Sequence, residues 1–263
     1  MRQSEKIRKV NVCYFYNFST IKNLQLFVSK GQELTRLVLL RHGKSVWNKD
    51  RHFTGWSDIA LSLQGEEEAQ KAGRSLMRAG FTFDACYSSE LKRARDTLAH
   101  VQSVMGLSHL PVHRSWRLNE RHYGALEGMR PWAAIRKFGI WPVLKTQLYF
   151  DATPPLLKAD DLRALANQHH YAAVDRTQLP LAESLQQALE RVQPLLRGTI
   201  LPEIRQGKRL LIVSHKGILR TLIMQLEGLT SAQAMRLSVT TGQPLCYELD
   251  RSFNPVNRYY LPD

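Results

Sequence analysis

Long hydrophobic runs are missing from this sequence. No stretch of about 18 uncharged apolar residues occurs anywhere in its 263 residues, so a transmembrane helix is not expected. The chain also lacks the apolar region and clear cleavage site of a signal peptide. Because 43% of the residues are nevertheless hydrophobic, there is enough apolar material for one sizeable core. We therefore expect a soluble, globular protein of the cytoplasm that does not bind membranes.

Cysteine is scarce, and its spacing excludes two common uses. Cys13, Cys86 and Cys246 are odd in number and far apart, and no CxxC pair occurs. This spacing is typical of reduced, mostly buried thiols in a cytosolic protein. No spaced set of histidines and cysteines offers a zinc site, and the adjacent pair His169-His170 is expected on a solvated surface. The sequence therefore predicts no metal site.

Acidic residues are few compared with basic ones. The chain has 23 Asp and Glu against 37 Lys and Arg, which gives a formal net charge of +14. Such an excess favours an anionic partner, and nucleic acid, an acidic membrane and phosphorylated metabolites all fit it. However, the cations are spread along the chain, and no helix-turn-helix, RNP-like or zinc-finger pattern occurs. Nucleic acid is therefore disfavoured, and a small phosphorylated molecule is the expected partner.

The first 34 residues differ from the rest of the chain. They are rich in basic residues, contain the run "VCYFYNF" and show no helical periodicity. We predict that residues 1–34 form a poorly ordered extension, with a targeting peptide as the alternative. Residues 35–263 are predicted to form a single α/β domain.

Strands and helices alternate in this second region. The continuous apolar run "RLVLLRH" (residues 36–42) is typical of a parallel strand buried on both faces. Similar strand-like runs are "FDACYSS", "RLLIVSH" and "PLCYEL". Apolar periodicity predicts helices over residues 62–80, 89–105 and 217–226. This order predicts a three-layer α/β/α fold with a mostly parallel sheet.

Residues 129–181 interrupt the alternation. They contain short helical pieces, no regular strand, and the prolines Pro131, Pro142, Pro154 and Pro155. A long segment without regular strands inside such a domain usually covers a binding site. We therefore predict a lid insertion over about residues 129–181.

Polar residues follow the predicted strands at their carboxyl ends, where open α/β sheets bind ligands. Arg41 and His42 end the first strand, Arg93 lies in the helix after "FDACYSS", and "RLLIVSH" ends in His215. Glu120 lies in "RLNERHYGALEG". Together these residues suggest phosphoryl transfer through a phosphohistidine, because a neutral imidazole is a nucleophile and guanidinium groups hold phosphoryl oxygens. Glu120 would move the proton, and the arginines would supply the charge, so no metal is needed.

Longer motifs give the chain a resemblance to a known family. From Leu37 to about Leu261 it resembles the cofactor-dependent phosphoglycerate mutases of the histidine phosphatase superfamily. The matching segments are "LVLLRHGKSVWNKDRHFTGWSD", "LSLQGEEEAQKAG", "SSELKRARDTL", "LNERHYGALEG", "ATPP", "LPLAESL", "SHKGILRTLI" and "TGQPLCYELD". The "RHG" triplet marks the superfamily, whereas "HFTGW" and "ERHYGALEG" are typical of the mutase branch.

The resemblance implies roles for particular residues. His42 would be the phosphorylated nucleophile. The phosphoryl group would be surrounded by Arg41, Arg93 and His215, and Glu120 would donate and accept the proton. By the same resemblance the substrate pocket would be lined by Ser45, Asn48, Thr54, Gly55 and Tyr123. Further candidates for binding the substrate are Arg121, Arg130, Lys216 and Gly217. Similar enzymes are primed by 2,3-bisphosphoglycerate, interconvert 3-phosphoglycerate and 2-phosphoglycerate in glycolysis and gluconeogenesis, and form homo-oligomers, either dimers or tetramers.

The chain departs from the family pattern where the second anionic group of the substrate is held. Lys216-Gly217 replaces a Gly-Asn pair, Arg130-Pro131 stands where Asn-Lys is expected, and Gln147-Leu148 stands where paired arginines are expected. The cations that could compensate are Arg130, Arg136, Lys145 and Lys216. Two alternatives therefore stay open: a phosphatase of the same fold acting on another phosphorylated metabolite, and a binding protein without catalysis. Lys216 is also expected to favour the neutral imidazole of its neighbour His215.

Overall fold

The computed structural model describes residues 34–158, 160–161, 168–250 and 252–262. The extension predicted for residues 1–34 lies, except for its last residue, outside the described residues, as does Cys13. Within the described part, Cys86 and Cys246 are free and buried, which confirms the prediction for these two thiols. No helix of this part is long and apolar enough to cross a membrane.

A six-stranded sheet with the order β3-β2-β4-β1-β5-β6 forms the centre of residues 34–262. The strands are β1 (Thr35–Arg41), β2 (Ala85–Ser88), β3 (Val112–Arg114), β4 (Leu210–Ser214), β5 (Pro244–Leu249) and β6 (Pro255–Tyr260). β1 to β4 are parallel, whereas β5 is antiparallel to both β1 and β6. The mostly parallel sheet is therefore confirmed. The antiparallel pairing of β5 with β6 follows from the short link between them, which permits a hairpin but is too short for a parallel crossover.

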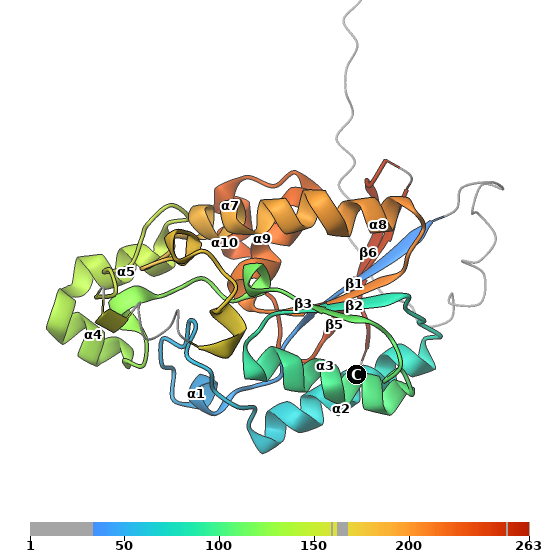
Figure 1. Ribbon diagram of the computed structural model, residues 1–263, viewed down its shortest axis with the longest axis horizontal. Helices are drawn as coiled ribbons and strands as arrows, with labels where there is room; N and C mark the ends of the chain where they lie inside the picture. Colours follow the sequence, from blue (N-terminus) through green and yellow to red (C-terminus); the bar gives the residue numbers. More distant parts are fainter. Residues whose placement is uncertain (1–33, 159, 162–167, 251, 263) are drawn as a thin grey trace, which may run out of the picture. The chain divides into compact units, whose positions relative to one another are not determined.

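Helices cover both faces of the sheet (Figure 1). One face carries α2 (Leu63–Arg78) and α3 (Lys92–Met105), and the other carries α7 (Leu185–Leu195), α8 (Leu201–Arg205) and α9 (Lys216–Glu227). Within β1, Leu37 and Leu39 pack on the α7 and α9 side, whereas Val38 and Leu40 pack on the α2 and α3 side. This two-sided burial is the reason that the apolar run of β1 is continuous instead of alternating.

The ends of the predicted helices agree with the structure to within three residues. The Ser62 side chain accepts a hydrogen bond from the Gly65 N–H at the start of α2, and Gly80 follows its end with a φ of +70°. The largest difference is at α3, which begins at Lys92 instead of residue 89. Ser89 stays outside the helix because its hydroxyl accepts the Leu91 N–H and contacts a buried histidine.

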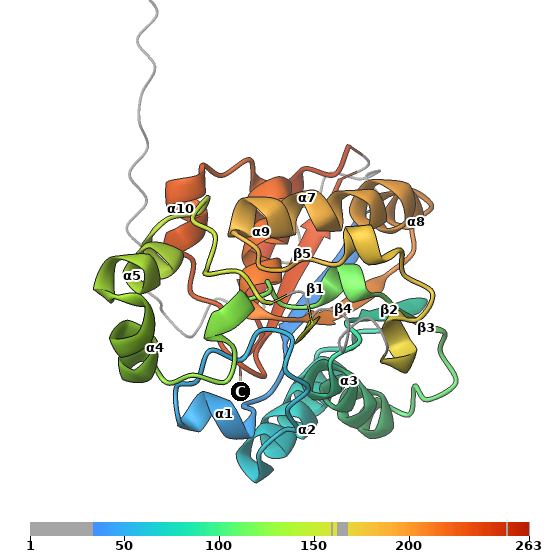
Figure 2. The same cartoon turned by 60° about the vertical axis from the view of Figure 1, so that its left-hand side comes forward.

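The segment predicted as a lid holds two short α-helices, α4 (Pro131–Phe138) and α5 (Ile140–Leu148), and no strand among its described residues. Figure 2 shows both helices beyond the end of the sheet, on the side where α1 (Val46–Lys49) and α10 (Ser231–Arg236) also lie. In the same segment His169 is exposed, whereas His170 is partly buried and its ring lies 4.3 Å from that of Tyr171. The prediction of a solvated pair therefore holds for His169 only.

Candidate active site

The register of the two central strands brings the predicted histidines together. Arg41 at the end of β1 pairs with Ser214 at the end of β4, so that the next residue of each strand is a histidine. The His42 N–H donates a hydrogen bond to the Ser214 carbonyl at 3.0 Å. As a result, the ring centroids of His42 and His215 lie 4.9 Å apart.

His42 is held as a neutral imidazole with one free nitrogen. Its side chain is only 4% exposed, and its Nδ1 lies 2.7 Å from the carbonyl oxygen of Gly43. A carbonyl can only accept, so Nδ1 carries the proton and Nε2 keeps a lone pair. Burial and the nearby Arg93 and Arg41 guanidinium groups hold the pKa of His42 well below its usual range. His42 Nε2 is therefore a nucleophile at neutral pH.

Gly43 of the "RHG" triplet is required by a close contact between backbones. A Cβ atom at this position would lie 2.1 Å from the carbonyl oxygen of Gly65 in the first turn of α2. The Gly43 N–H donates to the Thr97 hydroxyl of α3 at 3.0 Å. The glycine thus lets the chain pass directly between two helices while it carries His42.

Two arginines flank the histidines: Arg93 is buried, and Arg41 is partly buried. The Arg93 guanidinium is 1% exposed and donates to the carbonyl oxygens of Gly55 at 2.7 Å and Ser57 at 2.9 Å. Burial lowers its pKa to about 10, so it still carries its charge at neutral pH. Arg41 donates from Nη1 to the Val239 carbonyl, and its buried Nε has no partner among the described residues. Both guanidinium groups can therefore bind an anion beside His42.

His215 is fully buried and neutral. Its Nε2 lies 2.8 Å from the Ser89 hydroxyl, and its Nδ1 has no hydrogen-bond partner among the described residues. Burial, followed by the charges of Arg93 and other neighbours, holds the pKa of His215 well below its usual range. This direction agrees with the neutral imidazole expected from the sequence, but the largest cause is burial and not the charge of Lys216, which is exposed.

Glu120 reaches the start of helix α9. Its Oε1 accepts the N–H of Arg121 at 2.9 Å, and its Oε2 accepts the N–H of Gly217 at 3.2 Å. A Cβ atom on Gly217 would lie 2.3 Å from Glu120 Oε1. The unexpected glycine of the Lys216-Gly217 pair therefore leaves space for the carboxylate beside the other site residues.

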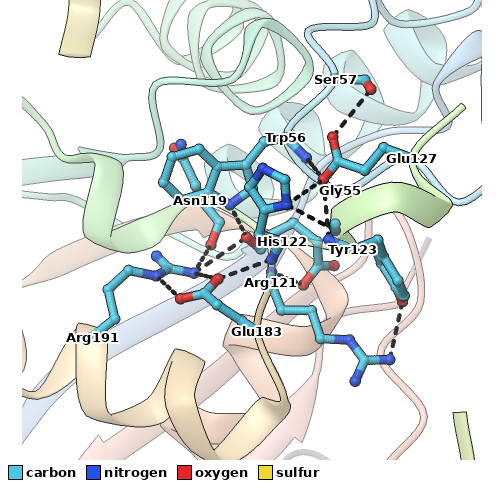
Figure 3. A network of polar contacts seen from close by, with 12 residues as sticks. Gly55, Trp56, Ser57, Asn119, Arg121, His122, Tyr123, Glu127, Glu183 and Arg191 are labelled. Carbon is cyan, nitrogen blue, oxygen red and sulfur yellow. Dashed lines mark hydrogen bonds and ion pairs between the residues drawn. The ribbon is translucent and has the colours of Figure 1, made fainter. Parts of the chain in front are cut away.

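A buried ion pair, which was not predicted from the sequence, supports the backbone that carries Glu120 (Figure 3). The Arg191 guanidinium is paired with Glu183 and donates to four main-chain carbonyls. These carbonyls belong to Trp116, Arg117, Asn119 and Glu120. In the sequence Arg191 resembles any helical cation, and nothing in its local pattern indicates that it is 8% exposed.

Replacing Arg191 with methionine is expected to lower the free energy of unfolding by about 3–5 kcal/mol, because it leaves Glu183 buried without its partner. Urea unfolding, followed by circular dichroism, measures this loss. The matched control is Arg197→Met, which removes an exposed arginine after α7 and should change stability by less than about 0.5 kcal/mol. Equal stability of the two variants would contradict a supporting role for Arg191.

Four of the site residues, Arg41, His42, Arg93 and Glu120, line one cavity of about 600 Å³, whereas the fully buried His215 does not. Its cationic lining consists of Arg41, Arg51, Arg93, Arg121, Lys216 and Arg220. Glu120 is the one acidic residue that lines it within the described part of the chain. Such a surplus of guanidinium groups suits a ligand with more than one anionic group.

Most of the residues predicted to bind substrate line this cavity. These are Asn48, Thr54, Gly55, Arg121, Tyr123, Lys216 and Gly217. The structure does not place the other two there. Ser45 is 1% exposed and caps α1 through reciprocal hydrogen bonds with Asn48, and Arg130 is half exposed with Asp50 3.8 Å away. Of the candidate substitute cations, only Lys216 lines the cavity, whereas Arg51 and Arg220, which were not predicted, do so.

Comparisons with known proteins agree with this geometry. The sequence model of the histidine phosphatase superfamily (branch 1) matches residues 37–156 and 156–259. The 2,3-bisphosphoglycerate-dependent phosphoglycerate mutase 1 of Nitrosomonas europaea is 75% identical over 230 residues, which cover 88% of this chain and 98% of the relative.

Two solved structures share the fold at lower identity. The alpha-ribazole phosphatase of Shigella flexneri is 26% identical with a TM-score of 0.62, and the match covers 84% of this chain and 94% of that one. A mycobacterial glucosyl-3-phosphoglycerate phosphatase is 24% identical with a TM-score of 0.62, over 81% and 92% of the two chains. Given the superfamily match and the identity to the Nitrosomonas enzyme, this chain belongs to the histidine phosphatase superfamily and, within it, to the family of 2,3-bisphosphoglycerate-dependent phosphoglycerate mutases.

Proposed function

We propose that this protein interconverts 3-phosphoglycerate and 2-phosphoglycerate, a step of glycolysis and gluconeogenesis, through a phosphohistidine at His42. The observation that carries the proposal is the buried, neutral His42 with a free Nε2 beside Arg41 and Arg93, in a cavity with further cations. The 75% identity to a phosphoglycerate mutase selects this reaction among those that such a site could perform.

In the proposed transfer, the arginines stabilise the charge of the phosphoryl group and Glu120 moves the proton. Arg41 and Arg93 neutralise the phosphoryl oxygens while the P–N bond to His42 Nε2 breaks and a bond to a substrate hydroxyl forms. That hydroxyl loses its proton to Glu120. In the return transfer His42 takes the other phosphoryl group, and Glu120 gives the proton to the oxygen that leaves. In the site without ligand, burial and the charge of Arg93 hold the pKa of His215 well below its usual range.

The residues present fit the priming compound 2,3-bisphosphoglycerate. When bound, it supplies the phosphoryl group that loads His42 before the first turnover. Its two phosphates and carboxylate match the six cations of the cavity, and buried donors without partners remain on Arg41 and Arg121. Arg41 and Arg93 would hold the phosphate beside His42, and the other anionic groups would contact Arg51, Arg121, Lys216 and Arg220. We find no group of three or more His, Cys, Asp or Glu among the described residues that could hold a metal.

Two further parts of the proposal concern the lid and the assembly. Five residues of the segment 129–181 line the cavity: Pro131, Ile135, Val143, Leu144 and Gln147. This contact supports a lid that covers bound substrate. We also propose that the protein assembles into a dimer or tetramer, which light scattering of the purified chain measures. The proposal further includes a cytoplasmic location and no nucleic-acid or membrane partner.

A single time course tests the proposed function. The purified protein is incubated with 3-phosphoglycerate and catalytic 2,3-bisphosphoglycerate, and both 2-phosphoglycerate and free phosphate are followed. The expected result is isomerisation that depends on the bisphosphate, with little free phosphate. Phosphate release without 2-phosphoglycerate would instead support a phosphatase, and the absence of both products would support a binding protein.

Arg220 is expected to hold the distal anionic group of the substrate. It lines the cavity and is fixed by two hydrogen bonds to the Leu237 carbonyl at 3.0 and 2.7 Å. Replacing it with methionine should raise KM for 3-phosphoglycerate at least about 10-fold, since a charge-assisted hydrogen bond is worth about 1.5–3 kcal/mol. Arg130→Met, at an arginine outside the cavity, is the control and should leave KM within about twofold. A larger effect at Arg130 would reverse this assignment.

A further inference from the structure

The Glu127 carboxyl group lies at the junction of two backbone segments of the site (Figure 3). It follows the short turn Gly124–Leu126, and its side chain is 14% exposed. Its Oε1 accepts the N–H groups of Trp56 at 2.8 Å and Tyr123 at 3.1 Å. Its Oε2 accepts the Ser57 hydroxyl at 3.3 Å. One side chain therefore joins the turn of residues 55–57 to the segment that carries Glu120.

The turn held by Glu127 is the same turn that holds Arg93. The carbonyl oxygens of Gly55 and Ser57 accept both hydrogen bonds of the Arg93 guanidinium, and the N–H and hydroxyl groups of the turn point to Glu127. Gly55 has a φ of +49°, and a Cβ there would lie 1.9 Å from Glu127 Oε1. The turn thus packs directly against the Glu127 carboxyl group. Because the turn holds Arg93, the position of Arg93 depends on this carboxyl group.

Burial of the Glu127 carboxyl group places its titration near neutral pH. Burial raises the pKa of Glu127 to about 7, against the opposing effect of the N–H donors and of Arg93. His122 Nδ1 lies 3.2 Å from Oε1, but burial lowers the pKa of His122 to about 3, and this nitrogen accepts the Gly124 N–H. Arg93 is therefore the cation that faces the carboxyl group. The negative charges of Glu120 and Asp58 also act on Arg93 and raise its pKa.

We propose, building on the phosphoryl transfer proposed above, that Glu127 is a positioning residue that holds the 55–57 turn and Arg93, and that its proton tunes anion binding beside His42. Oε1 accepts its two N–H groups in either protonation state, so the geometry persists when Glu127 ionises. The Ser57 hydroxyl donates to the carboxylate and accepts from the acid. Ionisation therefore changes only the charge of the Glu127 carboxyl group near Arg93. A negative charge there weakens the binding of an anion by Arg93.

Glutamine at this position separates the geometry from the charge. Its carbonyl oxygen can accept the Trp56 and Tyr123 N–H groups, and its amide can donate to the Ser57 hydroxyl. Glu127→Gln therefore resembles the protonated acid at every pH. Glu127→Ala removes the hydrogen bonds as well. The matched control is Glu67→Gln, at an exposed glutamate of α2 outside the site.

Binding of sulfate, measured by calorimetry, tests the proposal without any turnover. Sulfate stays a dianion from about pH 6 to about pH 8.5, whereas phosphate esters change their own charge in this range. Lysines such as Lys216 are present in every variant, so their titration does not cause a difference between variants. We expect the wild type and Glu67→Gln to lose at least about fivefold in affinity across this range, and Glu127→Gln to stay nearly constant. Glu127→Ala, if folded by its thermal unfolding transition, should bind more weakly than Glu127→Gln throughout.

The outcomes distinguish this inference from the proposed function. The same pH dependence in Glu127→Gln and wild type would overturn the role of the proton, and equal affinities of the alanine and glutamine variants would overturn the positioning role. Absence of isomerisation by the wild type, with the expected sulfate results, would overturn the proposed function and leave the inference standing. With both correct, the alkaline decline of kcat/KM for 3-phosphoglycerate moves to higher pH in Glu127→Gln.

Discussion

Replacing His42 with alanine will abolish phosphoryl transfer. In the proposed mechanism the imidazole Nε2 is the nucleophile, because Nδ1 is held by the Gly43 carbonyl and the charges of Arg41 and Arg93 act on the ring. Loss of a nucleophile lowers turnover by a factor on the order of 10⁶. We expect no isomerisation of 3-phosphoglycerate and no transfer of label from radioactive 2,3-bisphosphoglycerate to the protein.

The control for this variant is His109→Ala, which removes an exposed histidine after α3 and should retain wild-type activity. Both variants should show similar thermal unfolding, because the hydrogen bond of the His42 side chain is made to its own neighbour Gly43. Measurable isomerisation by His42→Ala would rule out a phosphohistidine at this position. Label on the protein in that variant would place the phosphoryl group on another residue.

Replacing Glu120 with glutamine will lower kcat by about 10²–10⁴-fold, the usual contribution of a general acid and base. The amide oxygen can still accept one of the two backbone N–H groups, whereas the amide NH2 group cannot accept the other, so the change removes the proton transfer and one hydrogen bond. KM for 3-phosphoglycerate should change less than kcat, because the lost interaction belongs to the transition state. Steady-state kinetics with saturating 2,3-bisphosphoglycerate separates the two constants.

A matched control again comes from Glu67→Gln, since this carboxylate is exposed and lies outside the cavity. It should leave both constants within about twofold of the wild type. A kcat of Glu120→Gln equal to that of the control would mean that another group or water moves the proton. Tyr123, which also lines the cavity, would then be the next residue to test.

The catalytic centre could be predicted from the sequence because parallel strands impose a simple rule. Their carboxyl ends meet at one edge of the sheet, so the residues that follow "RLVLL" and "RLLIVS" had to become neighbours. The structure gives the contact, with 4.9 Å between the rings of His42 and His215. Arg93 and Glu120 were identified in the same way and by their motifs, and both line the cavity.

The supporting residues could not be predicted, because their roles depend on burial and long-range contacts. Arg191 reads as an ordinary helical cation, yet it binds carbonyls more than 70 positions earlier in the chain. Glu127 lies in the motif "ERHYGALEG", but its role could not be inferred from the motif, because its contact with Trp56 spans 71 positions. Conversely, Ser45 and Arg130 match positions of the family pocket but lie outside the cavity in this chain.

The amino-acid sequence by itself determined the layered fold and the mostly parallel sheet, and it singled out the residues that we propose for phosphoryl transfer, since apolar periodicity and strand ends are local properties. The tertiary structure alone decided which cations line the cavity and what holds Arg93 and Glu120 in place. These depend on side chains that approach from distant segments, where burial sets both their partners and their charge. The proton of Glu127 is the clearest case, because a pKa of about 7 arises only when a carboxyl group is packed between two segments that meet in the folded chain.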